Sequence, residues 1–260
     1  MRCLSTASTG MLAQQTNVDT ISHNIANMNT TGYKRQRAEF QDLLYQNVSR
    51  PGASTGPDTK VPTGIQIGLG VKTAGVYRIH EQGTLQQTDN RYDLGIQGRG
   101  YFQVTMPSGE TAYTRDGSFQ VSDQGELVTT DGYQVQPGIT LPQDAVDVSI
   151  SKTGEVQVKT AGAPEMQTVG QLQLATFVNE AGLEAQGGNL FLETASSGQA
   201  TVGSPGDPGL GSLQQGFVEG SNVNPVAEIT ALITAQRAYE MNSRVVKTAD
   251  EMLSTTSQMR

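Results

Sequence analysis

The stretch Leu4–Met28, LSTASTGMLAQQTNVDTISHNIANM, sets the organisation of this chain. Alternating steps of three and four residues along it reach apolar side chains at every position except Gln14. This spacing is a heptad repeat, which places the side chains on one face of an α-helix. The positions are Leu4, Ala7, Met11, Gln14, Val18, Ile21, Ile25 and Met28. We therefore expect an amphipathic helix about 37 Å long, at about 1.5 Å per residue, that stops near Gly32.

The C-terminal end repeats the design. Asn224 is a good N-cap, Pro225 suits the first helical position, and Glu228 is close enough to favour the helix dipole. The same stepping then gives Leu232, Ala235, Tyr239, Asn242, Val246, Ala249 and Leu253. Small residues alternate with larger ones along this seam, so that a second helix can approach closely.

Asn, Gln and Thr occupy the remaining faces of both helices. A terminal helix with a polar back needs a partner, either the other terminus or another subunit. We therefore predict that residues 1–30 and 222–260 form one domain, in which the two helices pair as a coiled coil. The alternative is two ordinary helices packed on a globular core.

Between the termini the period of the apolar residues changes to two. Val148–Ile150 and Val156–Val158, separated by the turn pair Thr153-Gly154, predict a hairpin. Leu172–Leu174, leading to Phe177, is another alternating strand. Three turns at similar intervals, Asp116-Gly117, Gln124-Gly125 and Asp131-Gly132, separate the short runs Phe119–Val121, Leu127–Val128 and Tyr133–Val135. The fold class is therefore α+β, with a central, mostly-β domain of barrel or sandwich type over residues 71–216.

Two segments have an irregular composition rich in Pro, Gly, Ser and Thr. They are Gln46–Gly64 and Ser196–Gly211. The composition of the first predicts an extended arm or a mobile loop, and we expect residues 31–70 as a whole to form an extended linker arm.

Composition excludes several classes of protein. The 260 residues carry a net charge of −8, which disfavours a nucleic-acid partner because neutralising phosphates requires clustered Lys and Arg. The single cysteine, Cys3, rules out an internal disulfide and a Cys-based zinc site. The N-terminus has no continuous apolar stretch of the kind found in secretory signals, and no segment approaches the length of a membrane span.

No pattern predicts catalytic chemistry, a bound cofactor or a metal site. The two histidines, His23 and His80, are too scattered for a His-rich metal site, and the Asp-Gly and Asp-Asn pairs are typical of turns. Gly98-Arg99-Gly100 lacks the third glycine and the helix of a dinucleotide motif. Lys34, Arg35 and Arg37 either contact an anion or an acidic neighbouring subunit, or form a solvated face just past the helix.

Both termini resemble the flagellar rod and hook protein family. The resemblance lies in Asn24–Lys34 (NIANMNTTGYK), Ser221–Pro225 (SNVNP), Ala235–Asn242 (AQRAYEMN) and Thr248–Leu253 (TADEML). The central runs Gly98–Val104 and Tyr113–Phe119 are similar to the β-domain of that family. The motif positions that we carry over are Asn24, Asn27, Thr31, Gly32, Tyr33, Asn222, Asn224, Gln236, Arg237 and Tyr239. Cys3 and His23 depart from the residues expected there, which are Ala and Asn.

Within the family the chain is most similar to the distal rod type. A hook protein would be expected to carry a further outer domain, and proximal rod proteins are mostly shorter or lack this arm. The resemblance implies an arm that bridges subunits, with Tyr45, Pro51, Gly52, Pro62 and Gly64 as its marker positions.

The resemblance implies a structural subunit without catalytic activity or cofactor. It polymerises helically into a stiff hollow drive shaft that transmits torque from motor to hook and lets exported subunits pass. The implied partners are further copies of the chain, proximal rod and hook subunits, the outer-membrane and peptidoglycan bushing rings, the rod cap and the flagellar type III export apparatus. The implied location is the basal body, in the periplasm and reaching the outer membrane, after export without a cleaved signal.

The helical seams are then the assembly interface. Its expected residues are Leu4, Met11, Val18, Ile21, Ile25, Met28, Leu232, Ala235, Tyr239, Val246, Ala249 and Leu253. Because such helices are marginal alone, we expect them to be largely disordered in the monomer and to fold on polymerisation. The alternatives are a proximal rod or hook subunit, a secreted coiled-coil adhesin, and an extracellular enzyme or carbohydrate-binding β-protein. The last is disfavoured by the absence of Trp.

Overall fold

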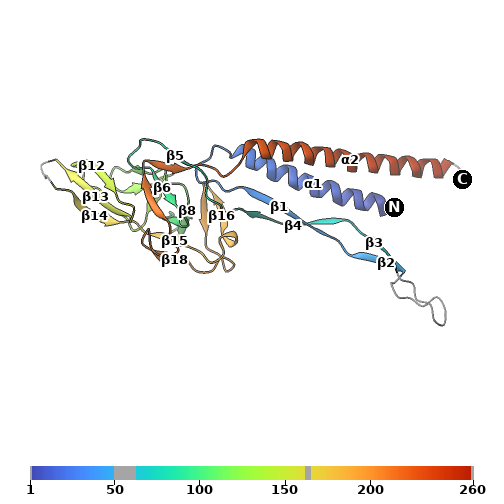
Figure 1. Cartoon of the computed structure of the whole chain (residues 1–260), viewed down its shortest axis with the longest axis horizontal. Helices are drawn as coiled ribbons and strands as arrows, with labels where there is room; N and C mark the ends of the chain where they lie inside the picture. The colour runs from blue at the N-terminus through green and yellow to red at the C-terminus, as the bar shows by residue number, and fades with distance from the viewer. Residues whose placement is uncertain (1, 50–62, 162–164, 259–260) are drawn as a thin grey trace, which may run out of the picture. The chain divides into compact units, whose positions relative to one another are not determined.

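The computed structural model describes residues 2–49, 63–161 and 165–258, and it divides the chain into two compact units (Figure 1). The first, here called the helical unit, comprises Met1–Ala26, Gln36–Tyr77 and Asn224–Arg260. The second, the β unit, comprises Asn27–Arg35 and Arg78–Val223. The fold is α+β, with a helix near each terminus and a central, mostly-β region between them.

Two long helices lie side by side in the helical unit (Figure 1). They are α1 (Arg2–Ala26) and α2 (Pro225–Gln258). The predicted start of α2 is confirmed, since the Asn224 side-chain oxygen accepts hydrogen bonds from the backbone amides of Val226 and Ala227. These two bonds satisfy amides that have no partner within the helix.

The predicted end of the first helix is wrong. The helix ends at Ala26 and not near Gly32, so Met28 lies in the turn that follows. The backbone amide of Thr30 donates to the Asn27 carbonyl, and its hydroxyl donates to the Asn27 side chain. A short polar side chain that bonds local groups competes in this way with helical bonding, which the apolar periodicity does not reveal.

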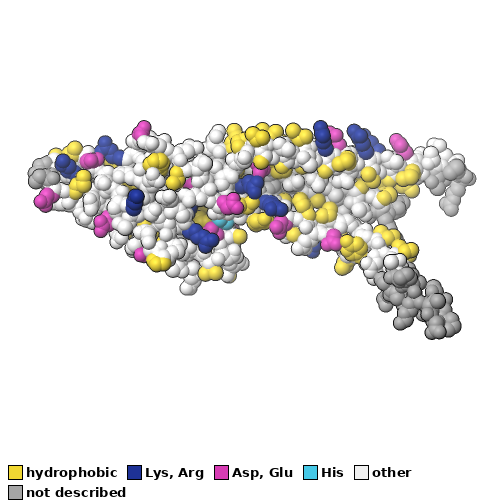
Figure 2. Space-filling view, in the orientation of Figure 1, with side chains coloured by type: hydrophobic (Ala, Val, Ile, Leu, Met, Phe, Trp, Pro, Cys, Tyr) yellow, Lys and Arg dark blue, Asp and Glu magenta, His cyan; other side chains and the backbone are white. Residues whose placement is uncertain are grey.

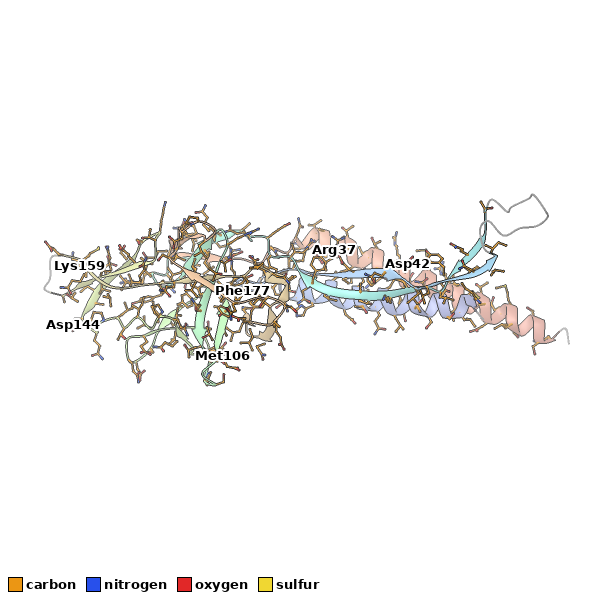
Figure 3. All side chains as sticks on the ribbon, turned by 90° about the horizontal axis from the view of Figure 1, so that it is seen from below. Arg37, Asp42, Met106, Asp144, Lys159 and Phe177 are labelled. Atoms are coloured by element: carbon orange, nitrogen blue, oxygen red, sulfur yellow. The ribbon has the colours of Figure 1, made fainter. Side chains whose placement is uncertain are left out.

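The rest of the helical unit consists of two-stranded ribbons. β1 (Gln36–Asp42) pairs with β4 (Val71–Arg78), and β2 (Tyr45–Ser49) pairs antiparallel with β3 (Ile65–Gly68). Figure 3 marks β1 by Arg37 and Asp42. The segment predicted as irregular therefore begins with strand residues at 46–49, whereas Pro51, Gly52 and Pro62 lie outside the described residues.

A nine-stranded sheet forms the centre of the β unit. Its main path runs β16-β17-β8-β7-β11-β10-β9, and β15 joins β7 and in turn pairs with β18. The bounds are β7 (Tyr101–Thr105), β8 (Thr111–Thr114), β9 (Gln120–Val121), β10 (Leu127–Val128), β11 (Gln134–Val135), β15 (Leu174–Thr176), β16 (Glu184–Gly187), β17 (Leu190–Leu192) and β18 (Thr201–Gly203). The short strands predicted between the Gly turns are thus confirmed as β9, β10 and β11.

Smaller sheets complete the β unit. The predicted hairpin is confirmed, because Val148 lies opposite Val158 and Ile150 opposite Val156. It belongs to a three-stranded sheet of β12 (Ala145–Ile150), β13 (Glu155–Thr160) and β14 (Gln167–Gln171). The remaining elements are the pairs β6 (Leu94–Gln97) with β19 (Ser212–Gln215) and β5 (Leu85–Gln87) with β20 (Phe217–Glu219), and a short 3-10 helix at Glu180–Gly182.

Two sequence predictions about the β unit need correction. The strand predicted over Leu172–Leu174 is interrupted, because β14 ends at Gln171 and β15 begins at Leu174. The Leu172 backbone amide donates instead to the Gly154 carbonyl in the hairpin turn. The segment Ser196–Gly211, predicted as irregular, contains the strand β18.

The core of the β unit lies on both faces of β7. Phe102 and Val104 are fully buried in a large, mostly aliphatic cluster, whereas Tyr101 points into an aromatic cluster with Tyr113 and Phe177. The rings of Tyr113 and Phe177 meet edge to face, with their centroids 4.8 Å apart. A strand that is buried on both faces marks the centre of a closed hydrophobic core.

Candidate assembly surfaces and a buried charge cluster

Small side chains line the contact between α1 and α2. Ala235 and Ala249 of α2 and Ala7 of α1 are buried, and each is a predicted seam position or on the seam spacing. A Cβ atom added at Gly10 would lie 3.0 Å from the side-chain nitrogen of Asn242. The helices thus approach closely where side chains are small, and a polar Asn side chain reaches into the contact.

The predicted seam residues differ in how far the described chain covers them. Ile21, Ala235 and Ala249 are buried, and Leu4, Met11, Val18, Ile25, Leu232 and Val246 are half-buried. Met28, Tyr239 and Leu253 are exposed. Within one chain the seam is therefore only partly covered.

The face of α2 opposite the predicted seam is not polar, although the sequence analysis predicts polar residues there. It carries an exposed apolar stripe at steps of mostly three, four and seven residues (Figure 2). The members of this stripe are Val226, Ile229, Ile233, Met241, Val245 and Met252. The prediction is wrong here because the seam count followed one face only. A helix with apolar residues on two faces can contact two neighbours.

Open grooves run along the helix pair. The larger, of about 760 Å³, is lined mostly by small side chains of α2. Its lining residues are Gln14, Asn17, Asn224, Val226, Ala227, Thr230, Ala231, Thr234, Ala235 and Ala238. A second, of about 390 Å³, includes Val18, Gln236 and Tyr239. Both have the form of sites into which another helix packs.

The ribbon of β2 and β3 also exposes apolar side chains. Leu44, Val48, Ile65, Ile67 and Leu69 are all exposed. Gln46 lies opposite Ile67, and the Leu69 amide donates to the Leu44 carbonyl, so Leu44, Ile67 and Leu69 share one face. Since a two-stranded ribbon is marginal in water, this face needs a surface to cover it.

Asn24 is the polar anchor of the helical unit. Its side-chain nitrogen donates to the Gln36 carbonyl at 2.8 Å and to the Glu228 carboxylate at 3.1 Å, and its oxygen accepts from the Gln36 amide at 2.8 Å. One buried amide thus joins the end of α1, the start of α2 and β1.

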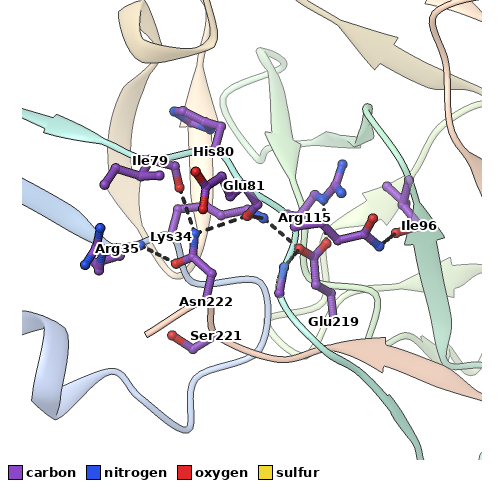
Figure 4. Close-up of polar contacts among 12 residues, drawn as sticks. Lys34, Arg35, Ile79, His80, Glu81, Ile96, Arg115, Glu219, Ser221 and Asn222 are labelled. Carbon is purple, nitrogen blue, oxygen red and sulfur yellow. Dashed lines mark hydrogen bonds and ion pairs between the residues drawn. The ribbon is translucent and has the colours of Figure 1, made fainter. Parts of the chain in front are cut away.

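A buried charge cluster lies in the β unit (Figure 4). It consists of Lys34, Arg115 and Glu219, with Glu219 contacting both cations. Lys34 Nζ is 2.6 Å from Glu219 Oε1, and Arg115 Nε is 2.6 Å from Oε2. Lys34 is only 3% exposed and Glu219 only 1%. The prediction of a solvated face is therefore wrong for Lys34, which pairs with a carboxylate of its own chain.

Backbone groups satisfy the rest of the charge cluster. Lys34 donates to the Glu81 carbonyl at 2.7 Å, and the Arg115 guanidinium donates to the carbonyls of Gly98 and Gly100. Glu219 Oε1 also accepts from the Gly83 amide at 2.8 Å. Burial lowers the pKa of Lys34, and the adjacent Glu219 carboxylate opposes that shift. A buried ion pair of this kind depends on such additional bonds.

His80 and Tyr101 lie near the cluster. The Tyr101 hydroxyl is 2.7 Å from His80 Nδ1 and 3.5 Å from the Glu180 carboxylate. Burial, and then the positive charges of Lys34, Arg78 and Arg115, lower the pKa of His80 to about 4. Burial also raises the pKa of Tyr101. Both groups are therefore neutral at pH 7.

The motif residues near the N-terminal end of the β unit make contacts within the chain. Asn27 bonds Thr30. Gly32 has a φ of +66°, and a Cβ atom there would lie 2.8 Å from the Asp116 amide nitrogen, so the position requires glycine. Thr31 and Tyr33, on either side of it, are half-buried.

The motif residue Asn222, near the C-terminal end of the β unit, also makes contacts within the chain. Its side-chain oxygen accepts from the Arg35 amide at 2.7 Å, and its nitrogen donates to the carbonyls of Ile79 and Glu81. By contrast, Gln236, Arg237 and Tyr239 lie exposed on α2. Of the positions predicted to mark an arm, Tyr45 is exposed on β2 and Gly64 is half-buried.

Several residues of these networks cannot be identified from the sequence pattern. Glu219, Glu228 and Arg115 are single charged residues, and nothing in their spacing marks them as partners. Among the described residues no group of three or more His, Cys, Asp or Glu side chains could hold a metal ion. No helix in that part of the chain is long and apolar enough to span a membrane.

Comparison with known families matches three parts of the chain. Residues 4–34 match a model described as flagella basal body rod protein. Residues 95–158 match the flagellar hook protein FlgE/F/G D1 domain, and residues 214–259 match the flagellar basal body rod FlgEFG protein C-terminal region.

Similar proteins align over nearly the full length. A flagellar basal-body rod protein FlgG of Caulobacter vibrioides is 64% identical over 261 residues, covering 100% of both chains. The FlgG of Agrobacterium fabrum is 52% identical over 99% of this chain and 98% of its own. The flagellar hook-basal body complex protein FlhP of Bacillus subtilis is 32% identical, covering 100% of both chains.

Proposed function

This chain belongs to the flagellar basal-body rod and hook protein family, and on that basis we infer that it is a structural subunit of the distal rod. The observation that carries the conclusion is full-length identity of 64% to a basal-body rod protein, together with matches to the family at both termini. Its relatives are structural flagellar proteins, and it assembles with itself and with other rod or hook subunits.

The helical unit supplies the inner layer of the polymer. We propose that residues 1–30 and 222–260 pair as a coiled coil around a central channel, and that helices of neighbouring copies pack against them. The apolar stripe of α2 and the small-residue groove beside it support this arrangement, because both remain open within one chain. The seam residues, Ile21 and Val246 among them, hold the pair together. The contact is heterologous and does not close, which generates a helical filament.

Residues 31–70 form the arm that bridges neighbouring subunits. The exposed apolar face of the β2–β3 ribbon supports this role, since Leu44, Ile67 and Leu69 would be covered by an adjacent copy. The positions Tyr45, Pro51, Gly52, Pro62 and Gly64 belong to this arm. An arm that crosses to the next subunit stiffens the shaft because bending would have to break its contact.

Residues 71–216 form the outer tube. The closed core of the β unit supports this, because a rigid body suits a shaft that transmits torque from motor to hook while exported subunits pass along its bore. The finer partners that we propose are the proximal rod, the hook, the outer-membrane and peptidoglycan bushing rings, the rod cap and the type III export apparatus. The subunit leaves the cytoplasm without a cleaved signal and assembles in the periplasm, up to the outer membrane.

The terminal helices order fully only on assembly. Their buried apolar positions are alanine except for Ile21, so pairing within one chain removes little apolar surface from water. The ordering entropy of two long helices is then offset mainly by contacts with neighbours. Export of a partly unfolded chain through a narrow channel is compatible with this order of events.

Electron microscopy of basal bodies from cells lacking this chain tests the function. We expect rods truncated before the outer membrane and without hooks, restored when the gene is returned on a plasmid. Complete rods with hooks in the deletion strain would overturn the proposal. Truncation without rescue by the returned gene would point to an effect on a neighbouring gene.

A further inference from the structure

Two segments that are far apart in the sequence meet at the charge cluster. Gly32 donates its amide to the Glu219 carbonyl at 2.7 Å, Lys34 pairs with the Glu219 carboxylate, and the Arg35 amide donates to Asn222. The three contacts follow one another along residues 32–35 and 219–222. One segment leads back to α1, which ends at Ala26, and the other leads on to α2, which begins at Pro225.

Other residues of the β unit hold the contact between residues 32–35 and 219–222 in place. Arg115 lies between β8 and β9 and bonds Glu219 on one side and the Gly98 and Gly100 carbonyls on the other. Asn222 and Lys34 both donate to the Glu81 carbonyl. The contacts between residues 32–35 and 219–222 therefore depend on the chain around Gly98 and Glu81, which supplies bonding partners for Arg115, Lys34 and Asn222.

We propose that Lys34, Arg115, Glu219 and Asn222 form a clasp that joins the two segments leading to α1 and α2, so that folding of the β unit places the bases of both helices next to each other. The assembly role of this clasp rests on the proposed function. Without the clasp the helices would have to close a loop of almost the whole chain each time they pair. With it their pairing becomes a local event at high effective concentration.

The chemistry of the clasp fixes a single register. Both oxygens of Glu219 are in use, one on Lys34 and Gly83 and the other on Arg115. A slip by one residue of either segment would leave two buried cations without their carboxylate, which is strongly unfavourable. An apolar contact in the same place would tolerate such slips. The polar cluster thus specifies which residues of the two segments face each other.

Amide hydrogen exchange of the full-length chain tests the clasp itself. In Glu219→Gln and Asn222→Ala, exchange at Gly32 and Arg35 should accelerate by roughly tenfold or more as the bonds to these amides weaken, while Val104 in the core stays protected. Lys159→Met and Asn179→Ala are matched controls, since both side chains lie on the exposed surface of the same unit and neither contacts the cluster (Figure 3 labels Lys159). Unchanged exchange at Gly32 and Arg35 in both clasp variants would overturn the proposal.

Asn222→Ala keeps the test decisive if Glu219→Gln fails to fold. It removes three hydrogen bonds and no charge. In cells, this variant should lower the fraction of basal bodies with complete rods several-fold, whereas Asn179→Ala should not. Normal rods built from an Asn222→Ala chain that shows fast exchange at Arg35 would overturn the role in helix pairing. That result is distinct from failure of the rod function itself, which would appear as complete rods in the deletion strain.

Discussion

The two units use apolar residues in opposite ways. The β unit encloses them, so that Ile96, Phe102 and Val104 have no measurable exposure. The apolar side chains that the helical unit buries are alanines and Ile21, and larger ones such as Ile233 and Val245 stay exposed. The first pattern is that of a domain that folds by itself, and the second is that of a surface completed by other chains. The contrast indicates that the β unit has a complete hydrophobic core, whereas the helical unit presents an apolar surface that other chains would cover.

The largest expected effect comes from two adjacent residues of α2. Val246 is half-buried towards the seam, and Val245 is exposed on the opposite stripe. Val246→Asp places a charge in the helix contact, and Val245→Asp places one on the outer face. We expect both, and likewise Ile21→Asp, to abolish rod assembly in basal bodies examined by electron microscopy.

The β unit should stay folded in these variants, as near-ultraviolet circular dichroism of its tyrosines would show. Val146→Asp is the matched control, since Val146 is exposed in the β unit. It should permit normal assembly. A normal rod built from Val246→Asp would contradict the seam, and one built from Val245→Asp would contradict the outer stripe alone.

Shortening a buried side chain in the core should destabilise the β unit, in contrast to the substitutions on α2, which should leave it folded. Phe102 is fully buried and packs edge to face on Phe119, with ring centroids 4.9 Å apart. Phe102→Ala should lower the free energy of unfolding of the β unit by about 3–5 kcal/mol. Val178→Ala, at a residue that is 94% exposed, should change it by less than about 0.5 kcal/mol. Urea unfolding followed by near-ultraviolet circular dichroism measures both, and equal midpoints would contradict the assignment of the core.

The sequence predicts those features that depend on local pattern. Two terminal helices, the cap at Asn224 and the hairpin of Val148–Val158 follow from periodicity and turn residues, because these act over a few positions. The predicted end of α1 is wrong, since the carbonyl and side chain of Asn27 bond Thr30 in the turn that follows the helix. The heptad pattern does not predict the second apolar face of α2, because a heptad count follows a single face of the helix.

The charge cluster is beyond the reach of such patterns. Lys34 and Glu219 are 185 residues apart, and Arg115 lies between them. No local rule relates single charged residues over that distance, and an ordinary expectation places a lysine beside a helix end in solvent. The resemblance marked Gly32 and Asn222 as motif positions without giving their physical roles. Those roles depend on tertiary contacts.

The β unit should also differ from the helical unit in its response to acid. The ordinary pKa of histidine is about 6.5, and that of His80 is lowered to about 4 by burial and by Lys34, Arg78 and Arg115. The Glu180 carboxylate is 3.7 Å away, but the Tyr101 hydroxyl bonds both groups and three cations oppose protonation. Folded His80 therefore stays neutral in a range where the unfolded chain is protonated.

Between pH 6.5 and 4 the unfolded state binds more protons at this residue, so the free energy of unfolding falls as the pH drops. At about 1.4 kcal/mol per pKa unit, the loss reaches at most about 3.5 kcal/mol. Urea midpoints measured from pH 7 to pH 4.5 should depend less steeply on pH in His80→Gln, whereas Asn179→Ala, at an exposed residue of the same unit that does not titrate, should follow the parent chain. Parallel pH profiles for all three proteins would contradict this role of His80, since the carboxylates of the chain contribute equally to the pH dependence of each protein.

The smallest expected effect lies at Gly10, where two terms of opposite sign compete. Replacing a helical glycine with alanine stabilises a helix by about 1 kcal/mol. The added Cβ atom, however, would lie 3.0 Å from the Asn242 side chain, which would have to shift by a few tenths of an ångström. We therefore expect Gly10→Ala to change the thermal midpoint of helix loss, followed by far-ultraviolet circular dichroism of assembled rods, by little in the parent chain. In an Asn242→Ala background the obstacle is gone, and the same substitution should show its full stabilisation. An equal gain in both backgrounds would mean that Gly10 and Asn242 do not touch in the assembled rod, and that the close approach of the two helices belongs only to the isolated chain.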